Sequence, residues 1–297
     1  MDSPPIRRVS ILGCGLIGTS IALALRGTGI HVALSDRDSQ AVATARRMGA
    51  GVALTPGAPA ADVVVVATPP STVVGVLRDA QDRGLGAVYT DVASTKARIV
   101  AEAERAGCDL TTYVPGHPMA GAEFSGPGAA RPDLFVGRQW MLSPHRGTPL
   151  GSVRTVAEMV AACGARHRIV PADQHDQLAA VISHAPHLVS AALAARFADA
   201  DRATLSLMGR GLQDVTRVAG GDPGLWCDIL QQNAEPVAAV LDAVVRELAA
   251  AADALRGGGR SASSAALADL LARGRQGRER IVGVSSAAAD AKDMIAA

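Results

Sequence analysis

The fold is decided by the stretch R-V-S-I-L-G-C-G-L-I-G-T-S at residues 8–20. Residues 8–12 predict a short buried strand, and residues 19–26 predict a helix. The turn between them carries G-x-G-x-x-G at Gly13, Gly15 and Gly18. In this strand–turn–helix context, the first glycine permits a tight turn and the second lets a pyrophosphate approach the backbone. The third lets the helix pack on the strand. The stretch therefore predicts a dinucleotide-binding unit.

A second strand is expected at His31–Ser35, and it ends in Asp36. A carboxylate at this point accepts from the adenosine ribose hydroxyls, which favours NAD over NADP. Arg37 leaves NADP open, because an arginine there can bind a 2′-phosphate. The expected cofactor-binding residues are Gly13, Gly15, Leu16, Ile17, Gly18, Asp36, Arg37, Thr68 and Pro69.

Strand and helix patterns continue to alternate as far as residue 170. The run at residues 62–67, D-V-V-V-V-A, is typical of a strand that is buried on both faces of a parallel sheet. Ser71 can cap the helix that follows it. Further helices are expected at residues 38–48, 96–106 and 152–163, and further strands at 87–90, 111–114, 138–143 and 166–170, with a loop at 120–137.

From Pro171 onward, helical patterns replace the strands. A long helix is expected at residues 173–200, with a kink at Pro186, and another at 222–256, capped by Asp222. The predicted fold is therefore an α/β Rossmann-like doubly wound sheet in residues 1–170, followed by an all-α dimerisation domain in residues 171–297. A flexible spacer is expected at 256–264, then a short helix at 265–273 and a loose tail.

Composition excludes several classes of protein. Aromatic residues make up 2% of the chain and the net charge is +1, so no nucleic-acid partner is expected. The four cysteines lie far apart, which argues against zinc and disulfides and fits a cytoplasmic protein.

The N-terminus also resembles a secretory signal, because Arg7 and Arg8 precede an apolar run at residues 9–25. The glycine spacing favours the strand–turn–helix instead. No later run approaches the roughly 20 apolar residues that cross a bilayer, so no membrane partner is expected.

Two candidate catalytic residues follow strand ends, where parallel sheets bind ligands. Ser94 follows the strand at 87–90, and His117 lies in V-P-G-H-P-M-A-G-A-E after the strand at 111–114. A neutral imidazole accepts protons near neutral pH. The flanking glycine and proline predict a sharp bend that presents His117 outside any regular element, close to Ser94. The alternative role of Ser94 is a helix cap.

His184 and His187 are spaced to share one face of a helix. The pair could bind a metal, but no third ligand stands at metal spacing, so no metal is expected. Arg217 could bind a carboxylate through its guanidinium fork, or form a surface salt bridge.

Together these motifs resemble the prephenate/arogenate dehydrogenase (TyrA-type) family. The matching segments are G-C-G-L-I-G-T-S at 13–20, D-V-A-S-T-K at 91–96, G-H-P-M-A-G-A-E-F-S-G at 116–126, S-H-A-P-H at 183–187, and D-V-T-R-V-A with D-P-x-x-W at 214–226. They span residues 8–235. Gln213 and Val215 depart from the family, which usually has basic and aromatic residues there.

The resemblance implies a homodimer formed through the C-terminal helices. It also implies NAD-dependent oxidative decarboxylation of prephenate to 4-hydroxyphenylpyruvate, in tyrosine biosynthesis. Arogenate or an amino-substituted prephenate remains an alternative substrate. A related 3-hydroxyacid dehydrogenase or imine reductase, or a non-catalytic NAD-binding sensor, is an alternative protein class.

The resemblance also implies roles for single residues. His117 would bond the ring hydroxyl of the substrate, and Ser94 would orient both partners. Arg217 would bind a substrate carboxylate. The remaining substrate-binding candidates are His187 near the substrate side chain, His184, and Glu123 with Asp214 in a gating ion network.

Overall fold

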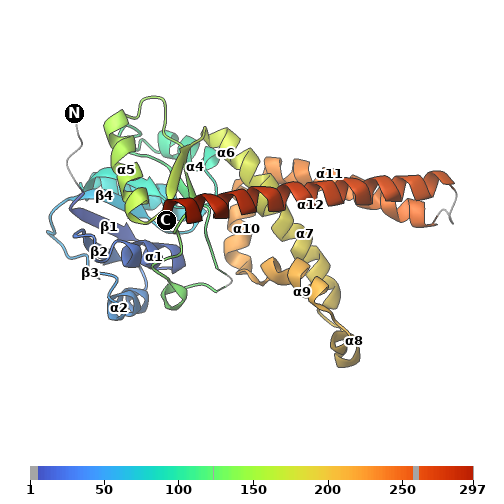
Figure 1. The fold of residues 1–297 in the computed structure, drawn as a ribbon. Coiled ribbons are helices and arrows are strands. Elements are labelled where there is room, and N and C mark those ends of the chain that lie inside the picture. Colours follow the sequence, from blue (N-terminus) through green and yellow to red (C-terminus); the bar gives the residue numbers. More distant parts are fainter. Residues whose placement is uncertain (1–5, 123, 257–260, 297) are drawn as a thin grey trace. The chain divides into compact units, whose positions relative to one another are not determined.

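The computed structural model describes residues 6–122, 124–256 and 261–296 (Figure 1). Its N-terminal half is built on a parallel sheet with strand order β3-β2-β1-β4-β5. The strands are β1 (Arg8–Leu12), β2 (His31–Ser35), β3 (Val52–Ala53), β4 (Ala61–Val66) and β5 (Gly86–Asp91). The order runs outward in both directions from β1 and β4, as in a doubly wound sheet, so the predicted Rossmann-like fold class is confirmed.

Helices cover both faces of this sheet, and β4 shows why. Val63 and Val65 are buried on the face that packs with α1 (Leu16–Ala24), α2 (Ser39–Arg47) and α5 (Leu150–Ala162). Val64 and Val66 are buried on the opposite face, with α3 (Val73–Asp82) and α4 (Ala97–Arg105). Successive side chains of a strand point to opposite faces, so a continuous run of valines fills both layers.

A second, smaller sheet follows α4. It consists of β6 (Gly116–Pro118), β7 (Gln139–Leu142) and β8 (Arg166–Ile169), with β6 antiparallel and β8 parallel to β7. The strand predicted at 111–114 is reduced to a single bridge between Tyr89 and Tyr113. Pro115 comes directly after this segment and has no N–H to extend a ladder.

Beyond β8 the chain is helical, as predicted, but the first long helix is interrupted. Helix α6 (Ala172–Ala179) leads into a π-helical turn, Ala180–His184, and then into α7 (Ala185–Ala194). Pro186 lies two residues after the turn. It cannot donate a backbone hydrogen bond and its ring crowds the preceding turn, which gives the turn a local cause.

The second long helix is also divided. After α8 (Arg202–Ser206) and α9 (Arg210–Thr216) come α10 (Pro223–Gln232) and α11 (Ala234–Arg256). Asp222 caps α10, as predicted, by accepting from the N–H of Leu225 at 2.8 Å. Asn233 separates α10 from α11, so the single helix predicted at 222–256 is wrong.

The structure divides into two compact units, Met1–Val237 and Ala238–Ala297. In the second unit, Arg273 of α12 (Ser261–Ala296) pairs with Glu247 of α11 at 2.9 Å. The predicted loose tail is wrong, because α12 continues through it. Residues 257–260 of the predicted spacer lie outside the described residues. The predicted domain boundary at residue 170 stays a prediction.

One segment, Ala172–Phe197, is long and apolar enough to cross a membrane by length and composition alone. This differs from the expectation that no later run approaches that length. The segment also carries the buried polar side chains of His175, Asp176, His184 and His187, and the first two contact residues of the sheet domain.

Candidate functional site

The glycine turn has the geometry that a pyrophosphate needs. A Cβ on Gly13, whose φ is +111°, would lie 2.2 Å from the carbonyl oxygen of Ala67, and one on Gly18 would lie 2.0 Å from that of Gly13. A Cβ on Gly15 would meet nothing within 4 Å. Gly15 is also the N-cap of α1 and gives it no side-chain cap, so the first amides of α1 can face an anion.

Asp36 holds this turn in place. Its Oδ2 accepts from the N–H of Cys14 at 2.6 Å, and its Oδ1 accepts from the N–H of Asp38 at 2.8 Å. The carboxylate at the end of β2 therefore ties the glycine turn to the neighbouring strand, a role that the sequence analysis missed. Arg37 is exposed beside it.

Thr68 and Pro69 follow β4, next to the glycine turn. The Oγ1 atom of Thr68 is buried without a hydrogen-bond partner among the described residues. Ser71 does not cap the next helix, contrary to the prediction. Its N–H and hydroxyl both donate to Oδ2 of Asp228 in α10, at 3.0 and 2.8 Å.

His117 lies in β6 and is 8% exposed, so the prediction that it lies outside regular structure and unburied is wrong. Gly116 provides the reason. A Cβ at that position would lie 2.8 Å from the carbonyl oxygen of Asp91 and 3.0 Å from Nε1 of Trp140. Because glycine has no Cβ, β6 can pack closely against β5 and β7.

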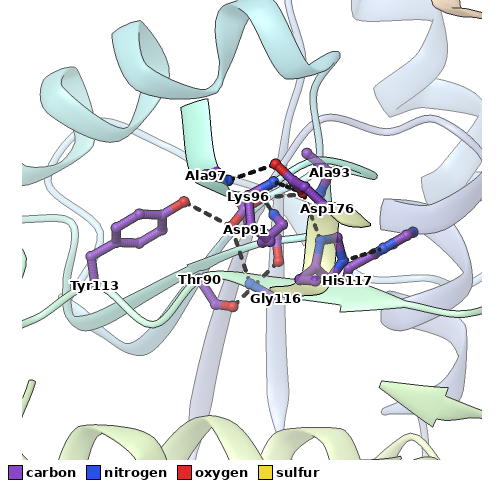
Figure 2. A network of polar contacts seen from close by, with 10 residues as sticks. Thr90, Asp91, Ala93, Lys96, Ala97, Tyr113, Gly116, His117 and Asp176 are labelled. Carbon is purple, nitrogen blue, oxygen red and sulfur yellow. Dashed lines mark hydrogen bonds and ion pairs between the residues drawn. The ribbon is translucent and has the colours of Figure 1, made fainter. Parts of the chain in front are cut away.

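A chain of three polar side chains starts at His117 (Figure 2). Its Nδ1 lies 2.8 Å from Nε2 of His175, and Nδ1 of His175 lies 2.8 Å from Oδ1 of Asp176. A carboxylate only accepts, so Nδ1 of His175 donates to Asp176, and in the tautomer with that one ring proton Nε2 accepts from His117. Nδ1 of His117 therefore carries the proton, and its Nε2 is left as the acceptor.

The side chain of Asp176 also caps the N-terminus of helix α4. Its Oδ1 and Oδ2 accept from the backbone N–H groups of Lys96 and Ala97, at 2.8 and 2.9 Å. Capping of α4 by Ser94 is therefore wrong, because a residue from α6 does it. Ser94 is half-buried. Nδ1 of His117 is bonded to His175 rather than to Ser94.

A buried ion pair joins the end of β5 to the residue before α4 (Figure 2). Lys96 and Asp91 are in contact and both are fully buried. Asp91 Oδ1 also accepts from the hydroxyl of Tyr113 at 2.7 Å and from the N–H of Gly116 at 3.1 Å. This network fixes the backbone next to His117. Burial lowers the pKa of Lys96, although the Asp91 charge opposes that shift.

Burial is the main cause that holds the pKa of His117 well below 6.5. The neighbouring His175, Lys96 and His184 lower it further. His117 is therefore neutral at neutral pH and can accept a proton.

His184 and His187 lie on the π-helical turn and on α7, and both are buried. Burial lowers the pKa of His184 to about 4 and also lowers that of His187. The ring of His187 stacks on Trp226, with centroids 3.5 Å apart and planes 11° apart. Within the described residues, no group of three His, Cys, Asp or Glu side chains could hold a metal.

The other predicted substrate residues are less closely placed. Arg217 is exposed in a short 3₁₀ turn, Arg217–Gly220, that packs against α7. Asp214 is exposed on α9. Glu123 lies outside the described residues. Their roles stay predictions.

Comparison with known proteins matches two adjacent family models. Residues 21–169 match the nucleotide-binding domain of prephenate dehydrogenase, and residues 171–272 match its dimerization domain.

Individual proteins agree with these matches. The chain is 38% identical to the probable prephenate dehydrogenase NovF of Streptomyces niveus, over 94% of this chain and 78% of that protein. It is 32% identical to the prephenate dehydrogenase of Bacillus subtilis, over 81% and 68%. A 4-amino-4-deoxyprephenate dehydrogenase of Streptomyces pristinaespiralis is 29% identical, over 89% and 90%.

Among solved structures, the prephenate dehydrogenase of Aquifex aeolicus, in complex with hydroxyphenyl propionate and NAD+, has the same fold. Its TM-score is 0.79 at 24% identity, covering 93% of this chain and 99% of that one.

Proposed function

Because the chain belongs to the prephenate dehydrogenase family, we propose that it converts prephenate to 4-hydroxyphenylpyruvate by NAD-dependent oxidative decarboxylation. The observation that supports this most directly is His117. Its ring is neutral and its Nε2 is an acceptor. The preceding Gly116 donates to Asp91 at the carboxyl end of β5, where a Rossmann-like sheet binds its ligands.

NAD fits the residues at the glycine turn. The open backbone at Gly15 and the first amides of α1 would bind the pyrophosphate, and Asp36 would accept from a ribose hydroxyl. Thr68 and Pro69 would line the same site. Bound NAD supplies the hydride acceptor. NADP stays an alternative because Arg37 is exposed beside Asp36.

In the proposed mechanism, His117 removes the proton of the ring hydroxyl. As hydride leaves the carbinol carbon, the hydroxyl proton passes to Nε2 of His117, and the ring becomes an imidazolium. Nδ1 of that imidazolium donates to His175, whose other nitrogen donates to the carboxylate of Asp176. The negative charge of Asp176 therefore stabilises the positive charge that forms during the reaction.

Loss of carbon dioxide then needs positioning more than acid–base catalysis. The bond to the ring carboxylate breaks, its electron pair enters the ring, and the aromatic product forms. We assign Arg217 to a substrate carboxylate and His187 to the side-chain end. Ser94 would orient the hydroxyl. Glu123 and Asp214 would belong to the gating ion network.

The helical half would form a homodimer. Large apolar side chains are exposed on α6, the π-helical turn and α7, namely Leu178, Val181, Ile182, Val189 and Leu193. Covering these exposed apolar side chains would favour association with a second copy. We also propose that the enzyme acts in the cytoplasm.

The substrate is tested by measuring NADH or NADPH formation with prephenate, arogenate and 4-amino-4-deoxyprephenate, each with NAD and with NADP. The proposal predicts the highest kcat/KM for prephenate with NAD. A higher value for 4-amino-4-deoxyprephenate would reassign the chain to that reaction, which one relative carries in its name. No turnover with any of the three would favour a non-catalytic nucleotide-binding protein.

A further inference from the structure

Asn233 occupies an unusual position, between α10 and α11, and it is 2% exposed. Its side-chain nitrogen makes two contacts. Nδ2 donates to the backbone carbonyl oxygen of Asp176 at 2.8 Å and lies 3.0 Å from Nδ1 of His184. One residue therefore links the helix that carries Asp176 to the π-helical turn that carries His184.

These contacts determine which nitrogen of His184 carries the proton. A carbonyl oxygen only accepts, so the Asn233 atom that faces Asp176 is the amide nitrogen. The same nitrogen faces Nδ1 of His184, and that atom must therefore be the acceptor. The neutral ring of His184 carries its proton on Nε2.

The Nε2–H group of His184 is a buried donor without an acceptor among the described residues. The side chain is 1% exposed, and a buried donor left unbonded typically costs about as much as a lost hydrogen bond. A ligand oxygen at this point would satisfy the donor.

We propose that Asn233 is a positioning residue that fixes His184 as a neutral hydrogen-bond donor to an oxygen of the bound substrate. This inference rests on the proposed function for the identity of the ligand, a cyclohexadienyl carboxylate. The site would then hold two imidazole rings with complementary hydrogen-bonding roles, because Nε2 of His117 accepts while Nε2 of His184 donates.

The wild-type enzyme tests the proton position directly. Long-range proton–nitrogen NMR of ¹⁵N-histidine-labelled protein distinguishes protonated from bare ring nitrogens, and His184→Gln assigns the signals. We expect a bare Nδ1 and a protonated Nε2 for His184. A proton on Nδ1 would overturn the inference. This readout does not depend on turnover, so it separates failure of the inference from failure of the proposed function.

The substitution Asn233→Asp tests the consequence for catalysis. A carboxylate accepts from Nδ1 of His184, so the proton moves and Nε2 becomes an acceptor. We expect kcat/KM to fall roughly 10- to 150-fold, the range for a lost hydrogen bond to a charged group. Affinity for NAD should stay within about 2-fold. Gln231→Glu adds the same charge at the exposed neighbouring position and should leave both kinetics and spectrum unchanged.

A double-mutant cycle separates this role from simple packing. In the His184→Gln background there is no imidazole whose proton could move, so adding Asn233→Asp should lower kcat/KM by less than about 3-fold. An equal loss in both backgrounds would show that Asn233 only links the helices, and would overturn the inference. If Asn233→Asp does not fold, the wild-type spectrum still decides.

Discussion

His175 is the most informative residue to replace, because it stands between His117 and Asp176. In His175→Leu, Nδ1 of His117 loses its acceptor and Oδ1 of Asp176 loses one of its two donors. The imidazolium that forms on His117 is then without its hydrogen bond to His175. Such a bond to a charged group contributes roughly 1.5–3 kcal/mol. At about 1.4 kcal/mol per factor of ten, kcat should fall about 10- to 150-fold.

The matched variant is His175→Gln, whose amide oxygen can accept from His117. It should lose less activity than His175→Leu, because the ring of His117 keeps its orientation and its bare Nε2. The assay is steady-state NADH formation with saturating NAD and prephenate. Urea unfolding identifies any loss of folded protein, since an unsatisfied buried polar group costs roughly 1–3 kcal/mol. A folded His175→Leu enzyme with kcat within about threefold of wild type would refute the proposed stabilisation of His117 by His175 and Asp176.

Three further predictions concern the cofactor, the substrate and pH. Asp36→Ala should raise the KM for NAD about 10- to 100-fold and leave the KM for prephenate nearly unchanged. The substitution removes the ribose acceptor and leaves the N–H of Cys14 without its partner, so an unchanged KM for NAD would contradict this prediction. Arg217→Ala should raise the KM for prephenate by a similar factor and leave the Kd of NAD unchanged; weaker NAD binding instead would make Arg217 structural. Burial lowers the pKa of His184 from 6.5 to about 4. Between these two pH values the folded state therefore binds fewer protons than the unfolded state. His184 should therefore contribute a fall of about 3 kcal/mol in the free energy of unfolding between pH 6.5 and 4. The fall should be smaller by about that amount in His184→Gln, and equal slopes in chemical denaturation would argue against this.

Local patterns predicted the nucleotide-binding turn well. Strand, glycine turn and helix are contiguous in residues 8–24, and Gly18 has no room for a Cβ because the carbonyl oxygen of Gly13 lies too close. The double role of Asp36 was not predictable in the same way. Its contact with Cys14 joins residues 22 positions apart, and the pattern of β2 says nothing of it.

The site was predicted only in part for the same reason. His117 is recognisable from its motif, but its partners His175 and Asp176 come from α6, almost sixty residues later. The sequence pattern places both within one long helix, and the burial of His117 depends on β7 as well as β5. Long-range pairing of this kind is set by tertiary packing, which a single sequence does not display.

The sequence does contain a signal for the break between α10 and α11. Pro236 stands inside the range 222–256, and a proline within a helical pattern usually marks the first turn of a new helix. Asn233 lies just before it, at the break. That proline therefore marks the position of the residue that holds His184.

The most direct test of the account is the pH profile of kcat/KM for wild type and His117→Asn. Because the pKa of His117 lies well below 6.5, wild-type kcat/KM should stay level through pH 6.5 and fall only at lower pH. His117→Asn should fold and bind NAD, lose about 10²- to 10⁴-fold in kcat, and show no acid limb in its residual rate. A folded His117→Asn enzyme that keeps both its rate, within a few-fold, and its acid limb would remove His117 from the mechanism.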